Sequence, residues 1–318
     1  MAKRLATERR VPLGTRLRRY LPIYAGLAPF FVLLIAFVGA PMIYGLAMSF
    51  TDWSTSVRRG LHFVGFQNYT YLLSGQGLAS TRFLKSLLNL VVYVPITVAV
   101  GLVIALTVAL IANALPARFQ GFLRGSYFVP TVLPLFLAVG IWQWLMNADT
   151  GLIASNLGKL GIGPGVNWVG TAGFAIAMVI FIDVWHSVGF NFILFSTGMQ
   201  DISPEIYDAA DVDGASTFQK MTRITVPMIE PIIFFAITYS FITALQVYDI
   251  PQILTSNTDP LLVGGPGQVM LFPVMEMVRV ARAGGESGLG RAAAEGVILM
   301  VIIAVVTFLT FGLRRRKS

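Results

Sequence analysis

Six long apolar runs follow one another along the chain, and polar connections separate them. Each run is close to the roughly 20 residues that an α-helix needs to cross a bilayer. The pattern therefore predicts an all-α fold, a polytopic membrane protein with six transmembrane helices. The predicted spans are residues 23–47, 87–113, 126–145, 171–195, 229–248 and 296–313.

Proline occurs inside the first three predicted spans. In water a proline argues against a helix interior, but in a membrane neighbouring helices and hydroxyl groups satisfy the carbonyls that it frees. We therefore expect kinks rather than helix ends at Pro29, Pro41, Pro95, Pro130 and Pro134.

Two of the predicted external connections, 48–86 and 249–295, are longer than ordinary loops. Loops of this length are usually functional. The second contains an apolar segment, 269–280, that is too short to span a bilayer. We interpret this segment as an interfacial or re-entrant piece.

The basic residues lie at the borders of the apolar runs and predict the topology. Seven of them precede the first span, whose apolar run exceeds the roughly 7–15 residues of a secretory signal core, so we expect an uncleaved anchor. With the N-terminus inside, 15 of the 23 Lys and Arg residues are cytoplasmic and 8 are external. This bias predicts a multi-pass membrane protein with both termini in the cytoplasm. The predicted regions are a basic tail at 1–22, a six-helix membrane domain at 23–313 and a second basic tail at 314–318.

Composition excludes most other classes of protein. The chain is 56% hydrophobic and 12% charged, whereas about a quarter of the residues are charged in an average soluble domain. The chain has no cysteine and two histidines, which excludes disulfide scaffolds and thiolate sites and supplies few metal ligands. The net charge of +8 lies at the borders of the spans, so we expect membrane lipid and no nucleic acid as a partner.

A polar segment, 201–231, follows the fourth span. Ser203 can cap a helix and Pro204 suits its first turn, so a short helix is predicted over about 204–213. Gly214 supplies a left-handed stop. Ser216 or Thr217 then caps a second helix, which we expect to end at Pro227.

One side of the first of these helices is small and moderately apolar, and acidic residues surround it. Ile206, Ala209, Ala210 and Asp213 lie three and four residues apart. Small side chains allow a partner to approach the backbone closely. The residues alone leave two possibilities open, a docking element and an ordinary loop between two spans.

The spacing in this segment resembles the EAA loop of ATP-binding-cassette importer permeases, which reads EAA, three residues, G, nine residues, I-x-L-P. The chain has Asp208-Ala209-Ala210, Gly214, and Ile224-Thr225-Val226-Pro227 at those intervals. Asp208 stands where Glu is usual, and Val226 where Leu is usual.

Further motifs resemble the maltose and glycerol-3-phosphate permease subfamily, so that the resemblance covers nearly the whole chain. They are residues 49–53 (SFTDW), 63–69 (FVGFQNY), 254–255 (LT) and 264–266 (GGP). The subfamily usually joins the last two motifs almost directly, whereas eight residues, 256–263, separate them here.

The resemblance implies a type I importer permease architecture, a place in the inner (cytoplasmic) membrane and a set of partners. These are a second related permease, two cytoplasmic ATPases, an external solute-binding protein and a carbohydrate substrate. The helix at 204–213 would couple closure of the ATPases to rigid-body switching of the permease. The residues implied in ATPase coupling are Glu205, Asp208, Ala209, Ala210, Asp213, Gly214, Ile224 and Pro227.

The chain carries no nucleotide-binding loop of its own. Its Gly158-Lys159 pair is followed by Leu160, so the pattern GxxxxGK[ST] fails. We therefore expect a non-catalytic translocation subunit without a cofactor, with ATP and Mg²⁺ bound by the partner ATPases.

Polar side chains recur at helical spacing inside three spans, near the middle of the bilayer, where solutes commonly bind in carriers. Asp183 lies roughly 18 Å from the start of its span and Tyr239 roughly 15 Å from the start of its own. These groups suit a neutral sugar or polyol, but hydrogen bonding between helices is the alternative. The predicted substrate-path residues are Asp183, Ser187 and Asn191, then Tyr239, Thr243 and Gln246, and finally Asn89 and Tyr93, with Thr97 one turn further on.

Other functions remain open on this pattern. A proton-coupled secondary carrier would use Asp183 and His186, and an integral membrane transferase would need an active-site cluster at one membrane face. Within the importer class, glycerol phosphate is the alternative substrate to a sugar. No basic residue lies within the six predicted spans, which favours an uncharged carbohydrate.

Overall fold

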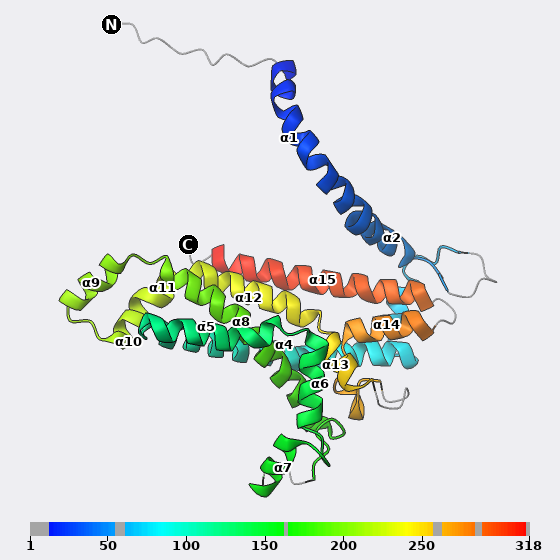
Figure 1. The fold of residues 1–318 in the computed structure, drawn as a ribbon. Helices are drawn as coiled ribbons and strands as arrows, with labels where there is room; N and C mark the ends of the chain where they lie inside the picture. The colour runs from blue at the N-terminus through cyan, green and yellow to red at the C-terminus, as the bar shows by residue number, and fades with distance from the viewer. Residues whose placement is uncertain (1–12, 55–60, 162–164, 257–262, 284–287, 316–318) are drawn as a thin grey trace.

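The computed structural model describes residues 13–54, 61–161, 165–256, 263–283 and 288–315 of the 318-residue chain. These residues form a bundle of long helices with shorter helices at its ends (Figure 1). The α-helices are α1 (Leu13–Leu34), α2 (Ala40–Met48), α3 (Gln67–Leu73), α4 (Leu78–Asn113), α5 (Ala117–Val132), α6 (Leu135–Leu145), α7 (Leu152–Lys159), α8 (Ala172–Gln200), α9 (Pro204–Val212), α10 (Thr217–Lys220), α11 (Val226–Met228), α12 (Glu230–Leu245), α13 (Asp249–Leu254), α14 (Pro273–Ala283) and α15 (Gly288–Arg315).

Five helical stretches of the described residues are long and apolar enough to cross a membrane, and a sixth span results if the bent pair α5–α6 is counted as one. The prediction of six membrane helices is confirmed on that count. The second span begins at Leu78, nine residues before the predicted residue 87, because the helix continues into polar sequence. The five stretches are Ile23–Met48, Leu78–Asn113, Ala172–Gln200, Glu230–Leu254, which joins α12 and α13, and Gly288–Gly312.

The third predicted span, 126–145, is not one continuous helix. α5 and α6 meet at a bend of 95°. Leu133 lies in extended conformation (ψ 132°), as expected for a residue that precedes a proline, and Pro134 is the N-cap of α6. The carbonyl of Leu133 lies 3.2 Å from His186 Nε2, so α8 contacts the backbone group that the break leaves free.

The other prolines have smaller effects. α4 and α5 continue through Pro95 and Pro130 without interruption. In the first span a π-helical segment, Ile35–Gly39, stands between α1 and α2 and directly precedes the turn that contains Pro41. Only Pro134 therefore breaks a span.

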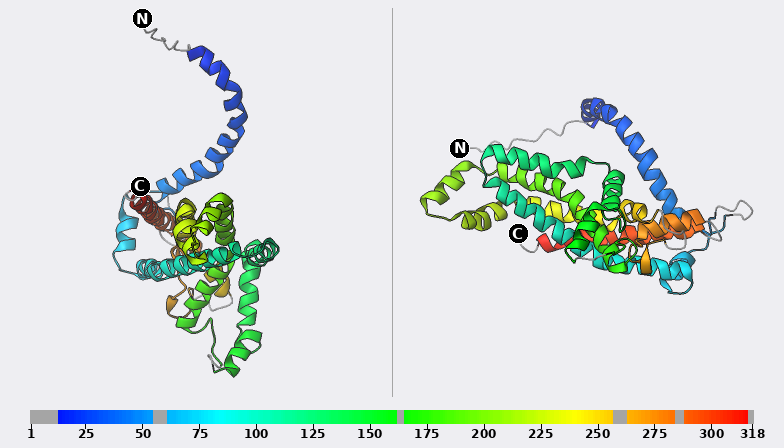
Figure 2. Two further views of the ribbon diagram at one scale, coloured as in Figure 1. Left: turned by 90° about the vertical axis from the view of Figure 1, so that its left-hand side faces the viewer. Right: turned by 60° about the horizontal axis from the view of Figure 1, so that its bottom comes forward.

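The centre of the bundle is the contact of α4 with α8 (Figures 1 and 2). Ala105 and Ala109 of α4 are fully buried and pack in the same apolar cluster as Phe192 of α8. α5 lies on another face of α8, where Gly189 permits a very close approach. A Cβ atom at Gly189 would lie 2.0 Å from the carbonyl oxygen of Tyr127.

α1 stands apart from this bundle, and the first span contacts it only through α2, which packs on α15 (Figures 1 and 2). None of the residues in its most apolar window is buried. Large side chains such as Phe37 and Ile43 are 76% and 68% exposed. Because this surface is apolar on all sides, it needs lipid or another protein around it.

The 49–53 and 63–69 motifs pack together at the end of the bundle opposite α9. The buried Asn68 donates to the carbonyls of Ser49 (2.9 Å) and Thr51 (2.8 Å), and Tyr69 Oη lies 2.6 Å from Ser49 Oγ. The apolar segment 269–280 largely forms α14, which packs along α15 and α4. It therefore packs on the end of the bundle, and its interfacial or re-entrant placement stays a prediction.

Candidate functional site

The segment 201–231 forms a helical hairpin, α9–α10, that projects from one end of the bundle (Figure 1). α9 begins at Pro204, and Ser203 takes the N-cap position, but its side chain makes no capping hydrogen bond, so that expectation was wrong. Gly214 is left-handed (φ 75°), as predicted. The N–H of Ala215 donates to Ala210 O (2.9 Å) and that of Gly214 to Asp211 O (3.1 Å), the Schellman pattern that ends a helix.

The second helix of the hairpin begins as predicted and ends differently. Ser216 and Gln219 form a reciprocal capping box. Pro227 does not end the helix. A π-helical segment, Met221–Thr225, accommodates the proline, and the chain breaks at Ile229 before α12 begins. The N–H of Val226, the residue before the proline, donates to Met221 O, the i→i−5 bond of a π turn.

Contacts between the two arms hold the hairpin in shape. Tyr207 Oη lies 2.9 Å from Thr225 Oγ1, and Lys220 Nζ lies 2.7 Å from Asp211 Oδ1. Apolar side chains remain uncovered at the tip, where Val212 is 89% exposed and Phe218 is 74% exposed. Of the predicted coupling residues, Glu205, Asp208, Ala209, Asp213, Gly214 and Pro227 are exposed, Ile224 is half-buried and Ala210 is buried.

A polar cluster lies between α4, α8 and α12, at the position where the sequence places the substrate path. Tyr93 of α4 is fully buried, and its hydroxyl donates to Asp183 Oδ2 of α8 at 2.5 Å. Asp183, Ser187, Asn191 and Thr243 line one small cavity of about 30 Å³. The structure thus brings together predicted residues from three different spans.

Two polar atoms in this cluster are buried without a hydrogen-bond partner among the described residues. They are Thr97 Oγ1 and Asn191 Oδ1, and both residues line the small cavity. An unsatisfied buried polar group costs about 1–3 kcal/mol, so such groups normally serve a polar occupant. A hydroxyl group, which both donates and accepts, fits this lining.

A second cavity, of about 190 Å³, adjoins the other side of Asp183. Thr243 and Gln246, two of the predicted path residues, line it together with Tyr248 and Asp249 at the junction of α12 and α13. Sequence reasoning missed these two residues, and also Ser240 in the smaller cavity. Ser240 precedes Thr243 by three residues, a helical spacing that identifies it in retrospect, whereas nothing in the sequence indicates that the chain turns inward at Asp249.

Two predicted path residues make other contacts. Tyr239 is 42% exposed and packs against Phe190, with the ring centroids 5.1 Å apart. Asn89 Nδ2 donates to the carbonyls of Gln268 (2.7 Å) and Leu271 (2.8 Å), so it braces the loop after α13. A substrate-path role for these two residues stays a prediction.

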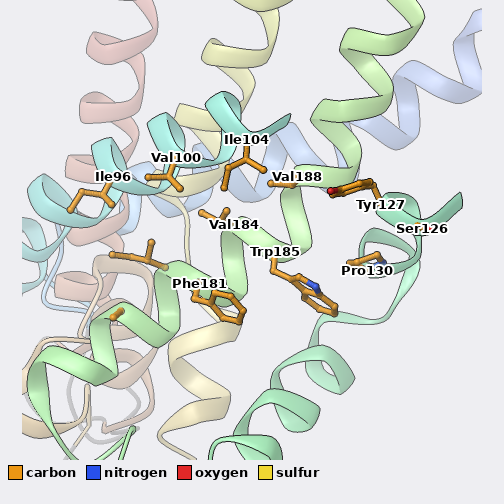
Figure 3. Close-up of a pocket in the computed structure, with 12 residues that line it drawn as sticks. Ile96, Val100, Ile104, Ser126, Tyr127, Pro130, Phe181, Val184, Trp185 and Val188 are labelled. Carbon is orange, nitrogen blue, oxygen red and sulfur yellow. The ribbon is translucent and has the colours of Figure 1, made fainter. Parts of the chain in front are cut away.

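A larger cavity, of about 780 Å³, lies between α4, α5 and α8 (Figure 3). Its walls are mainly aliphatic and aromatic, and the close-up shows Phe181 and Trp185 facing it from α8. This lining suits lipid or an apolar helix rather than a hydroxylated solute. Among the described residues there is no group of three or more His, Asp or Glu side chains that could hold a metal ion.

The chain is similar to a known protein family and to several known proteins. The family model "Binding-protein-dependent transport system inner membrane component" matches residues 72–318. The sulfoquinovosyl glycerol transport system permease protein SmoG of Agrobacterium fabrum is 32% identical over 92% of this chain and 90% of its own length. The trehalose/maltose transport system permease protein MalF of Thermococcus litoralis is 30% identical over 80% of this chain and 81% of its own length.

Solved structures show the same fold. A chain of a bacterial alginate ABC transporter, crystallised in complex with an alginate pentasaccharide-bound periplasmic protein, superposes with a TM-score of 0.79 over 96% of this chain and 97% of that chain, at 22% identity. The family match covers most of the chain and includes the helical hairpin, the polar cluster and five of the six spans. The chain is a member of the family of inner-membrane components of binding-protein-dependent transport systems.

Proposed function

We propose that this chain is the permease subunit of an ATP-driven importer that moves an uncharged carbohydrate from an external binding protein into the cell. The observation that carries this proposal is the hairpin α9–α10, a rigid projection with exposed apolar side chains at its tip. Its partners would be a second related permease, two cytoplasmic ATPases that bind ATP and Mg²⁺, and the binding protein. Both termini and the hairpin would face the cytoplasm.

The hairpin has the physical properties of a coupling element. Two contacts between its arms, Tyr207 with Thr225 and Lys220 with Asp211, make it move as a unit. Val212 and Phe218 offer apolar anchors of the kind that dominate interface energies. ATPase closure would pull on this unit, and α8 and α12, which flank it in the chain, would transmit the displacement to the polar cluster.

The polar cluster favours a neutral, hydroxylated solute. The two cavities beside Asp183 are lined by carboxylates, hydroxyls and amides. No Lys or Arg side chain is among these lining residues, and Asp249 adds a second carboxylate. A phosphate group would be repelled here, so an importer of glycerol phosphate is disfavoured. The names of the relatives, which include an arabinooligosaccharide permease, support a sugar.

The exposed first span supports a second permease. The first span has 26 residues, and none of those in its most apolar window is buried, so this window gains no stabilisation by packing within the described subunit. A related subunit that packs against α1 and α2 would cover it.

His186, which the alternative of a proton-coupled carrier requires, contacts the backbone at Leu133, and no hydrogen bond joins it to Asp183 in the part of the chain described here.

The test is reconstitution of the full transporter in liposomes, with uptake of labelled neutral sugars measured with and without ATP. Phe218→Asp should lower both uptake and binding-protein-stimulated ATP hydrolysis by about tenfold or more, because loss of an interface anchor costs about 2 kcal/mol. Phe218→Leu is the matched control and should retain most activity. Normal uptake by Phe218→Asp would refute the coupling role, and uptake without ATP would refute the importer.

A further inference from the structure

A third polar cavity, distinct from the cluster around Asp183, lies where α6 and α13 end. It has a volume of about 350 Å³, within the size range of ligand sites. Its walls come from the end of α6, the turn after it, the turn before α8, the end of α13 and the loop that follows α13. The polar lining residues are Gln143, Asn147, Asp149 and Asn167.

The segment that closes one side of this cavity, residues 264–271, is tightly folded. Gly264 and Gly265 adopt positive φ angles of 89° and 70°. A Cβ atom at Gly264 would lie 3.0 Å from Leu271 Cα, and the N–H of Met270 donates to Gly264 O (2.9 Å), so the segment folds back directly on itself. The side chain of Asn89 fixes the same loop through its two hydrogen bonds to backbone carbonyls. A binding wall built in this way is preorganised, which reduces the entropic cost of binding.

The asparagines of the cavity are oriented by their own turns. Asn147 Oδ1 accepts hydrogen bonds from the N–H groups of Asp149 (3.0 Å) and Thr150 (3.0 Å). Asn167 Oδ1 accepts from the N–H of Gly170 (2.8 Å). With each carbonyl oxygen engaged, the amide N–H groups remain as donors at the cavity, beside the carboxylate of Asp149.

This set of groups selects a class of ligand. Fixed amide donors next to a carboxylate acceptor match neighbouring hydroxyl groups, each of which donates one hydrogen bond and accepts others. No Lys or Arg side chain is among the lining residues, so an acidic sugar would meet Asp149 without a compensating cation. We propose that this cavity is a subsite that receives one ring of the uncharged saccharide as it leaves the binding protein, before the sugar reaches the cluster at Asp183. The proposal rests on the function proposed above.

The position of the cavity agrees with such a transfer. Leu254, Gly265 and Pro266, three of its lining residues, belong to the 254–255 and 264–266 motifs. α12 leads from the cluster at Asp183 to α13, whose C-terminal residue Leu254 forms part of the wall (Figure 1). The same backbone therefore connects the two sites.

Filling the cavity tests the proposal. Ala148 lines it, so Ala148→Phe occupies the space without removing a polar group. Ser155→Phe is the matched control, because Ser155 is exposed on α7 outside the cavity. In the reconstituted transporter, Ala148→Phe should lower sugar uptake per ATP hydrolysed by about tenfold or more, while the unliganded binding protein still stimulates ATP hydrolysis normally. Ser155→Phe should change neither quantity.

Other outcomes would overturn the proposal. If Ala148→Phe also abolishes stimulation by the unliganded binding protein, the cavity receives a loop of that protein rather than the sugar. Unchanged uptake per ATP in Ala148→Phe refutes the subsite while the importer stands. Absence of ATP-driven sugar uptake in the unmodified transporter instead refutes the proposed function itself.

Charge at the cavity gives an independent readout. Asp149→Asn retains the size of the side chain and removes its charge. It should raise the uptake of a uronic-acid saccharide relative to a neutral one by about fivefold, the effect of one charge pair about 4 Å apart in a water-like dielectric. An unchanged ratio would place Asp149 outside the path of the sugar.

Discussion

The close contact of α5 with α8 allows one substitution to be worked out in detail. A Cβ atom at Gly189 would lie 2.0 Å from Tyr127 O and 2.5 Å from Thr131 Oγ1. Ordinary contacts begin near 3.4 Å, so Gly189→Ala forces the helices about 1.4 Å apart at this point. The obstacle is a backbone carbonyl, which cannot rotate away. The hydrogen bond from Thr131 Oγ1 to His186 O (2.8 Å) lies in the same contact and is strained with it.

The expected cost is the difference of two effects. Overpacking costs about 1–3 kcal/mol, and replacement of a helical glycine by alanine returns about 1 kcal/mol. Gly189→Ala should therefore destabilise the protein by up to about 2 kcal/mol and lower its apparent melting temperature in detergent by up to about 5 °C. Gly125→Ala, in the interior of α5 with no atom within 4 Å of its new Cβ, is the control and should leave the melting temperature unchanged or slightly raised. The reasoning is refuted if Gly189→Ala melts at or above Gly125→Ala.

Further predictions concern the hairpin, the polar cluster and the braced loop. Gly214→Ala places an alanine at φ 75°, which costs about 1–2 kcal/mol, so uptake should fall severalfold while the amount of protein in the membrane stays unchanged. Gly214→Asn should retain more activity than Gly214→Ala. Equal uptake by the unmodified protein and both variants would contradict this reasoning. Asp183→Asn keeps an acceptor for the Tyr93 hydroxyl, so it should change sugar affinity with little loss of stability; identical uptake kinetics with every sugar would reduce Asp183 to a structural role. Tyr93→Phe should lower the melting temperature, because it leaves the buried carboxyl group of Asp183 without this donor, at a cost of about 1–3 kcal/mol. Asn89→Leu removes two hydrogen bonds to the loop after α13, so the backbone amides of residues 268–271 should exchange with deuterium about tenfold faster. Unchanged exchange rates would show that the side chain of Asn89 does not hold the loop in place.

The sequence predicted the spans well because bilayer thickness imposes a length that can be read from hydropathy. It placed the start of the second span at 87 rather than Leu78, since a helix ends where its hydrogen bonds end and not where its apolar residues end. The break of the third span was underestimated. Two prolines four residues apart have different effects, and only Pro134, after an extended Leu133, turns the chain by 95°.

In the candidate site, too, the sequence predicted some features and not others. The stripe of Asp183, Ser187 and Asn191 follows from helical spacing, and the structure places all three on one cavity. Asn89 belongs to a similar stripe, yet its partners lie 179 and 182 residues further along the chain. Periodicity tells which residues share a face of a helix but not what that face meets, so contacts between distant segments require the folded structure.

The isolation of the first span has a consequence for assembly. Because α1 packs closely on no other described helix outside its own span, and only α2 contacts the bundle, at α15, a change in the direction of α1 breaks no packed contact among the described residues. The π-helical segment between them, with its looser turn, makes bending at this point easier still. The first span can therefore change its direction to fit the neighbouring protein. The subunit accommodates neighbours of different shape without repacking its core.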